Sequence, residues 1–135
     1  MILFENSILK LNYNPATDIV EVVYPDLHDY LVPEIKYSID KLVVNVKNYD
    51  IKKLLLDSTN TKVLIDAAES SEIALYLAAG LANTRLQKVA RLQSSSSDIE
   101  KNAGNNIRKA QETISLPFEL KNFTSKAEAL QWLSA

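Results

Sequence analysis

Three consecutive leucines, Leu54, Leu55 and Leu56, stand between a pair of lysines and an aspartate. Successive side chains of a β-strand point to opposite faces of its sheet, so an unbroken apolar run places nonpolar groups on both faces. A strand of this kind is typical of the interior of a parallel sheet. The leucine run therefore predicts an α/β fold with 54–56 in an interior strand.

The segment before the leucines changes its hydrophobic period once. Residues 8–13 and 19–24 alternate apolar and polar side chains, and the turn-forming residues 14–18 separate them. This arrangement predicts an antiparallel hairpin. Apolar residues then recur at helical spacing from Ile35 to Val46, with Pro33 in the expected first turn.

The segment after the leucines repeats one pattern, strand followed by helix. The expected elements are a helix over about 67–86, a strand over 88–93, a helix after the serine run 94–97, a strand over 118–123 and a closing helix. A polar cap followed three residues later by glutamate marks each helix start. These pairs are Asp66 with Glu69, Ser97 with Glu100, and Ser125 with Glu128.

The order of elements predicts the whole architecture. We expect one α/β domain over residues 1–135, with a mixed, mostly parallel five-stranded sheet and about four helices. The N-terminal hairpin precedes three strand–helix units, and its antiparallel strand lies at or near an edge of the sheet.

Composition excludes several classes of protein. The net charge is −2 with lysine and arginine scattered, which argues against a nucleic-acid-binding surface. The chain has no cysteine, and no apolar run approaches the ~20 residues of a membrane span. The first seven residues have no basic region before their apolar residues, unlike a signal peptide. These features predict a cytoplasmic protein.

Catalytic and metal sites have little support in the sequence. His28, the single histidine, lies beside Asp26 and Asp29, which suggests either a metal or acid–base site or a solvated turn. The solvated turn is favoured because such sites need more converging ligands. Neither glycine lies in a strand-to-helix turn where a phosphate loop would need it. We therefore expect no enzyme, no cofactor and no bound metal.

Two stretches carry a resemblance to a known family. Residues 4–24, FENSILKLNYNPATDIVEVVY, look like the opening hairpin of small stand-alone bacterial members of the STAS-domain, or SpoIIAA-like, superfamily. Residues 117–133, PFELKNFTSKAEALQWL, look like their ending, and the element order is similar over nearly the whole chain. The resemblance implies a SpoIIAA-like fold and a non-catalytic regulatory or protein-interaction role.

The phosphorylation switch of that family does not carry over to this sequence. Anti-sigma-factor antagonists have Asp-Ser-Ser-Gly where the middle helix begins, and a partner kinase phosphorylates one serine. Asp57 matches the family's aspartate at the end of the middle strand, but Asp66 and Ala67 occupy the region of the phosphoserine. The resemblance thus implies a module without the usual phosphoserine motif, in which Ser58 and Thr59 are the nearby hydroxyls that a kinase would reach.

Candidate binding residues gather in two hydroxyl-rich stretches, 57–61 and 94–98. Both are expected at the carboxyl ends of the parallel strands, where ligands bind in open α/β sheets. Their hydroxyls serve either as caps and turn formers or as donors to an anion or phosphorylated partner. The residues of this edge and of the adjoining helix start are Asp57, Ser58, Thr59, Asn60, Asp66, Glu69, Glu72, Ser95, Ser96 and Ser97. The two glutamates are either paired carboxylates or a solvated helix face.

Two classes of function stay open at this stage. The first is a module that docks on an unknown protein partner, or on its own copy as a homodimer, through the middle helix and adjacent loops. The second is a domain that binds a small ligand, an anion or a lipid, because relatives in the broad fold class hold apolar ligands. This alternative predicts an internal cavity beside the alanine-rich stripe of residues 74–82.

Overall fold

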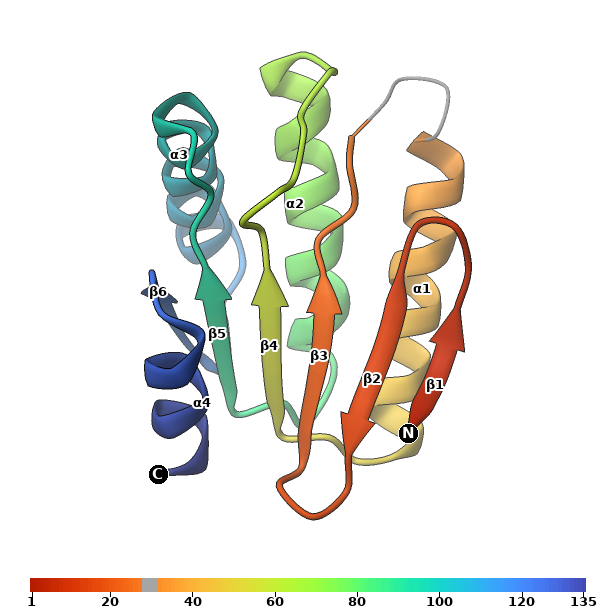
Figure 1. Cartoon of the computed structure of the whole chain (residues 1–135). Coiled ribbons are helices and arrows are strands. Elements are labelled where there is room, and N and C mark those ends of the chain that lie inside the picture. Colours follow the sequence, from red (N-terminus) through yellow and green to blue (C-terminus); the bar gives the residue numbers. More distant parts are fainter. Residues whose placement is uncertain (28–31) are drawn as a thin grey trace.

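The computed structural model describes residues 1–27 and 32–135, so His28 lies outside the described residues (Figure 1). The described elements follow in chain order. They are β1 (Ile2–Glu5), β2 (Lys10–Asn14), β3 (Ile19–Val23), α1 (Val32–Asn48), β4 (Lys53–Asp57), α2 (Ala67–Ala82), β5 (Lys88–Leu92), α3 (Ser97–Thr113), β6 (Glu119–Phe123) and α4 (Lys126–Ser134).

The described strands form one six-stranded sheet in which they lie in sequence order. The first three strands pair antiparallel, and the pairs from β3 to β6 are parallel. The mixed sheet, the hairpin of β2 and β3, and the four helices confirm the prediction from element order. The predicted number of five strands is wrong, because β1 adds a sixth.

Strand β1 lies at one edge of the sheet and pairs only with β2. Its register shifts between Ile2 and Phe4, and Ile2 is half exposed. Four residues are too few to show alternation, so no periodicity marks this strand in the sequence. Its backbone becomes a strand because the free edge of β2 supplies hydrogen-bond partners.

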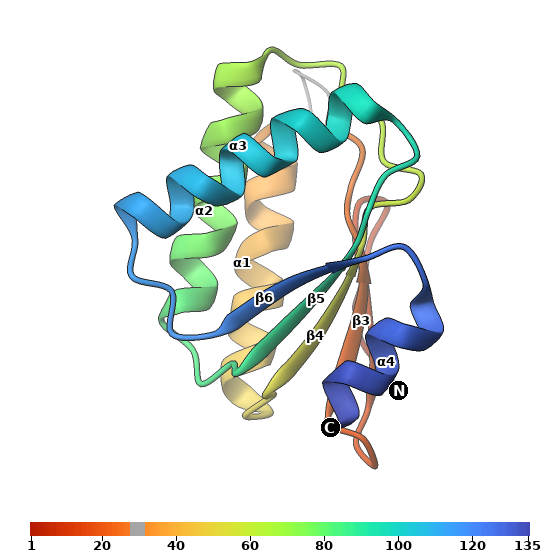
Figure 2. The ribbon, with the colours of Figure 1, turned by 90° about the vertical axis from the view of Figure 1, so that its left-hand side faces the viewer.

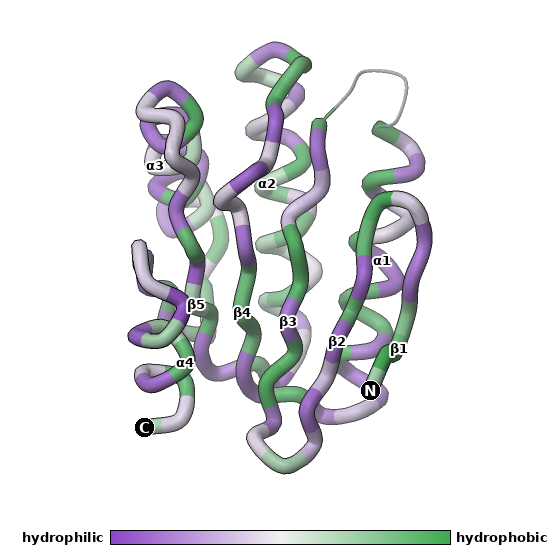
Figure 3. The backbone as a smooth tube through the Cα atoms, in the orientation of Figure 1, coloured by the Kyte–Doolittle hydropathy of each residue, from purple (hydrophilic) through white to green (hydrophobic). Residues whose placement is uncertain are grey.

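The helices cover the two faces of the sheet unequally. Figure 2 shows α1, α2 and α3 on one face and the short α4 on the other. Leu54 and Leu56 join the core beneath the three helices, whereas Leu55 packs with Ala129 and Leu133 of α4. All three leucines are buried, as the apolar run predicts. The tube in Figure 3 shows this apolar centre of the sheet, with hydrophilic residues at the strand ends.

Two of the three predicted caps are confirmed, and one is shifted. The side chain of Asp66 caps α2 by accepting a hydrogen bond from the backbone N–H of Glu69. The side chain of Ser125 caps α4 by accepting one from the backbone N–H of Glu128. The cap of α3 is Ser96 rather than Ser97. With the cap at Ser96, Glu100 lies one position too late for a capping box, and its carboxylate accepts from Arg91 on the neighbouring strand and from the backbone N–H of Ser94.

Helix α2 is shorter than predicted and packs closely on α1. It ends at Ala82, and Asn83 caps it, so the expected end at Leu86 is wrong. Leu86 lies in the following loop, where its burial accounts for the apolar pattern that suggested a longer helix. A Cβ atom on Gly80 would lie 2.7 Å from Cγ2 of Val43, so the two helices approach at a glycine.

Candidate functional site

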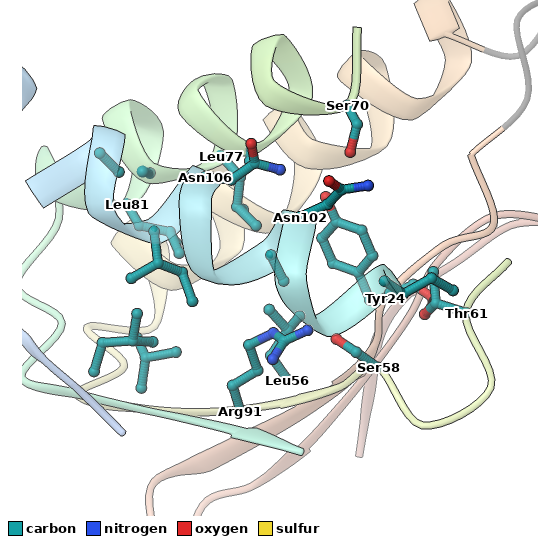
Figure 4. Close-up of a pocket in the computed structure, with 18 of the residues that line it drawn as sticks. Tyr24, Leu56, Ser58, Thr61, Ser70, Leu77, Leu81, Arg91, Asn102 and Asn106 are labelled. Atoms are coloured by element: carbon teal, nitrogen blue, oxygen red, sulfur yellow. Dashed lines mark hydrogen bonds between the residues drawn. The ribbon is translucent and has the colours of Figure 1, made fainter. Parts of the chain in front are cut away.

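A cavity of about 130 Å³ lies between α2, α3 and the helix-covered face of the sheet (Figure 4). Leu77, Ala78 and Leu81 line it from α2, and Ile107 and Ala110 line it from α3. It occupies the position that the ligand-binding alternative predicts, beside the alanine stripe of residues 74–82.

Small side chains on two helices create this space. Ala74 and Ala78 of α2 and Ala103 of α3 face the cavity and offer only methyl groups. Protein interiors are packed to nearly crystalline density, so a space of this size is unusual. It is present here because the alanine side chains do not fill it. Ile99 and Ile107 of α3 are only half-buried, which indicates that this helix packs loosely. The predicted apolar stripe of α3 therefore forms a roof over the cavity rather than a filled core.

One end of the cavity is polar. Figure 4 shows the side chains of Tyr24, Ser58 and Arg91 there, and these residues lie at the ends of β3, β4 and β5. Asn102 and Ser70 face the same end from α3 and α2. The polar end thus coincides with the carboxyl ends of the parallel strands.

Most of the uncharged groups at this end have no protein partner. The hydroxyls of Tyr24, Ser58 and Ser70 and the amide of Asn102 form no side-chain hydrogen bond with any described residue. The described part of the chain has no fully enclosed side-chain oxygen or nitrogen that lacks a hydrogen bond. These groups therefore reach accessible space, where a bound molecule or water supplies their partners.

Backbone and hydroxyl contacts hold the strand ends together at this point. Thr61 also lines the cavity, but its hydroxyl donates to the carbonyl oxygen of Tyr24 at 2.9 Å. The backbone N–H of Ser58 donates to the carbonyl oxygen of Leu92 at 3.1 Å. The loops after β3, β4 and β5 are thereby joined, which positions the polar groups relative to one another.

Arg91 is the only charged side chain among the described residues that line the cavity. Its Nη1 and Nη2 donate to the two carboxylate oxygens of Glu100 at 2.8 and 2.9 Å. Both side chains are largely buried, at 8% and 20% exposure. Such bidentate pairing neutralises both charges and anchors the first turns of α3 to β5.

The pKa values of two groups follow from this environment. Burial alone would raise the pKa of Glu100, but hydrogen bonds from Arg91 and from the backbone N–H of Ser94 hold it below its usual value. Burial raises the pKa of Tyr24 to about 12, although the charge of Arg91 opposes this shift. Glu100 is therefore ionised and Tyr24 protonated at neutral pH.

Comparison with family models, curated proteins and solved structures finds no match. No helix in the described part of the chain is long and apolar enough to cross a membrane. The described residues also contain no group of three or more histidine, cysteine, aspartate or glutamate side chains placed to hold a metal ion.

Among the binding residues predicted from the loop after β4, Ser58 lines the cavity. Asp57 instead accepts hydrogen bonds from the backbone N–H and the hydroxyl of Thr59, which closes a tight turn. Asn60 is exposed at the tip of that loop. The sequence suggests that a kinase would reach Ser58, but this residue is only 3% exposed in the folded protein.

The predicted residues on the helices lie apart from this loop. Asp66 caps α2 by accepting from the backbone N–H of Glu69 at 2.8 Å. Glu72 binds Lys36 of α1 at 2.6 Å on the exposed side of α2. In the serine run Ser96 caps α3, and its two neighbours, Ser95 and Ser97, are exposed.

Several cavity residues were not predicted from the sequence. Arg91 left a signal, since a charged residue inside a strand buried on both faces requires a partner. Asn102 and Asn106 share the face of α3 that carries Ile99 and Ala103, at a spacing of four. Tyr24 gave no comparable signal, because a tyrosine at the end of a hairpin strand is more often part of the core.

Proposed function

We propose that this protein binds, without catalysis, a small molecule whose short apolar body occupies the cavity beneath α3. The observation that carries the proposal is a mainly apolar cavity with a group of unpaired polar side chains at one end. Binding pockets for small molecules have this composition, with mostly apolar walls and a few convergent polar groups.

The volume of the cavity limits the size of the ligand. An engineered apolar cavity of about 150 Å³ in another protein binds benzene. The cavity here, at about 130 Å³, is of similar size. The proposed ligand therefore places a single ring or a short alkyl chain between Leu77 and Ile107.

Binding is favoured over catalysis by the state of the charged groups. Arg91 and Glu100 are bound to each other, and the lowered pKa of Glu100 makes its carboxylate a weak proton acceptor. Tyr24 stays protonated at neutral pH and is equally unsuited to act as a base.

Saturation-transfer NMR with toluene tests the proposal, because toluene has the required size and no head group. We expect toluene to bind the wild-type protein and Ala79→Leu, but not Ala78→Leu. Ala78 lines the cavity, whereas Ala79 is exposed on the same helix. The two variants therefore make the same substitution inside and outside the cavity.

Two results would overturn the proposal. One is the absence of toluene binding to the wild-type protein, and the other is equal binding to wild type and to folded Ala78→Leu. Circular dichroism of both leucine variants verifies that the fold is retained. Native mass spectrometry of the purified protein then searches for a molecule retained from the cell.

A STAS-like protein-interaction module is the second candidate function. Tyr37 and Val44 of α1 are about half exposed, and Tyr76 of α2 is also exposed, so the α1–α2 side offers apolar groups to a partner. The partner or homodimer, the cytoplasmic location and the SpoIIAA-like assignment stay predictions from the sequence. Phosphosite mapping of the protein tests the expected absence of the family's switch.

A further inference from the structure

We infer that the ligand of this cavity carries an uncharged hydrogen-bonding head, an alcohol, phenol or carbonyl, rather than a carboxylate or an ammonium group. The inference rests on the proposed function and adds the chemical class of the ligand. In the inferred pose the head lies against Tyr24 and Ser70, and the apolar body lies between α2 and α3 (Figure 4).

The first argument is that the charges at the polar end are already balanced. Both terminal nitrogens of Arg91 bind Glu100, and both oxygens of Glu100 accept from Arg91. A ligand carboxylate would either displace Glu100 from the guanidinium or lie beside a carboxylate of the same sign. A ligand ammonium group would lie beside the guanidinium. Either ion would leave a charge poorly compensated in a largely buried site.

The second argument is that the free groups at this end are uncharged and serve as both donors and acceptors. They are the hydroxyls of Tyr24, Ser58 and Ser70 and the amide of Asn102. An alcohol, which also donates and accepts, satisfies groups of this kind without bringing a charge into the cavity. Tyr24 remains available as a donor because burial raises its pKa to about 12.

The third argument concerns the orientation of the ligand. Away from the strand ends, the cavity wall is mainly apolar and includes Leu77, Leu81, Ala110 and Leu120, with the amide of Asn106 beside Leu77. A polar head placed among these side chains would lose its hydrogen bonds to water without replacement. The head is therefore directed to the carboxyl ends of the strands and the body to the opposite end.

Three probes that share a benzene ring test this inference at neutral pH: benzyl alcohol, benzoate and benzylammonium. Dissociation constants are measured by chemical-shift titration of the wild-type protein, with toluene as the probe without a head. We expect benzyl alcohol to bind about tenfold more tightly than either ion, and several-fold more tightly than toluene.

The possible outcomes separate the inference from the proposed function. If benzoate or benzylammonium binds as tightly as benzyl alcohol, or if toluene does, the inference is wrong while the cavity remains a binding site. If no probe binds, toluene included, the proposed function fails and the inference fails with it.

Matched variants locate the head group. Tyr24→Phe removes one hydroxyl from the cavity and keeps the ring, and we expect about fivefold weaker binding of benzyl alcohol with toluene unchanged. Tyr37→Phe makes the same substitution at a residue of α1 that is 54% exposed, and should change neither affinity. Ser70→Ala provides a second test of the same position, because Ser70 also lines the cavity there. Unchanged affinity for benzyl alcohol in both Tyr24→Phe and Ser70→Ala would overturn the inferred pose.

Discussion

Glu100→Gln removes one charge from the ion pair that joins α3 to β5 and leaves the guanidinium of Arg91 without a counter-ion. The side chain of Arg91 is 8% exposed, so water reaches it poorly. Removing one partner of a buried pair costs about 3–5 kcal/mol. Because the glutamine carbonyl still accepts one hydrogen bond, we expect a loss in unfolding free energy at the lower end, about 3 kcal/mol.

A double-mutant cycle isolates the interaction itself. Arg91→Met should also destabilise the fold, since it leaves the carboxylate of Glu100 without a positively charged partner. The double variant, Arg91→Met with Glu100→Gln, should lose about 1–3 kcal/mol less than the sum of the single losses. Urea unfolding followed by the fluorescence of Trp132, the only tryptophan, measures all four proteins.

An exposed ion pair provides the control for this cycle. Lys36 and Glu72 are 2.6 Å apart, but their side chains are 30% and 61% exposed. Glu72→Gln should therefore cost no more than about 1 kcal/mol. Equal losses for Glu100→Gln and Glu72→Gln, or additive losses within about 0.5 kcal/mol in the cycle, would refute the role assigned to the buried pair.

The same pair predicts a pH dependence. The pKa of Glu100 is lowered in the folded protein from its ordinary value of 4.5, so the folded state binds this proton less readily than the unfolded state. The stabilisation from ionised Glu100 is fully present at pH values above the pKa of this group in the unfolded state. It is lost as the pH falls through the lower pKa of the folded state. The stability difference between wild type and Glu100→Gln should thus be constant near neutral pH and shrink under acid conditions. A difference that stays constant throughout acidification would contradict this assignment.

The remaining predictions concern packing and modification. Leu55→Ala should lower the unfolding free energy by about 2–5 kcal/mol, and an unchanged urea midpoint would show that β4 is not buried on the face that α4 covers. Gly80→Ala should lower the unfolding free energy by about 1–3 kcal/mol, because the new methyl group would collide with Val43 of α1. Gly104→Ala should raise it by about 0.5–1 kcal/mol, because no heavy atom lies within 4 Å of the new Cβ atom. Ser70 and Ser71, at 7% and 6% exposure, should carry no phosphate in protein from its native cells, and stoichiometric phosphate at either site, by mass spectrometry, would contradict the absence of a switch.

Local patterns in the sequence were sufficient for most of the elements. Two short alternating stretches predicted the hairpin of β2 and β3, and helical spacing predicted α1. The leucine run of β4 predicted burial on both faces, because side-chain direction along a strand depends only on the backbone. The caps at Asp66 and Ser125 were equally visible, since a capping bond joins residues three positions apart.

Features that depend on neighbours in space were missed or misplaced. Strand β1 pairs along the free edge of β2, and Glu100 binds Arg91 of the neighbouring strand while Ser96, not Ser97, caps α3. The alanine stripe of α2 suggested a cavity, but the stripe alone does not establish one.

The polar end of the cavity was decided by the tertiary structure. Ser58 was recognised from its loop, whereas Tyr24, Arg91 and Asn102 come from segments far apart in the chain. Parallel pairing brings the ends of β3, β4 and β5 to one edge, and the loose packing of α3 leaves room beneath it. Periodicity reports which face of an element is apolar, but the space left between two apolar faces depends on how closely the elements approach, and that distance is set by side chains on both.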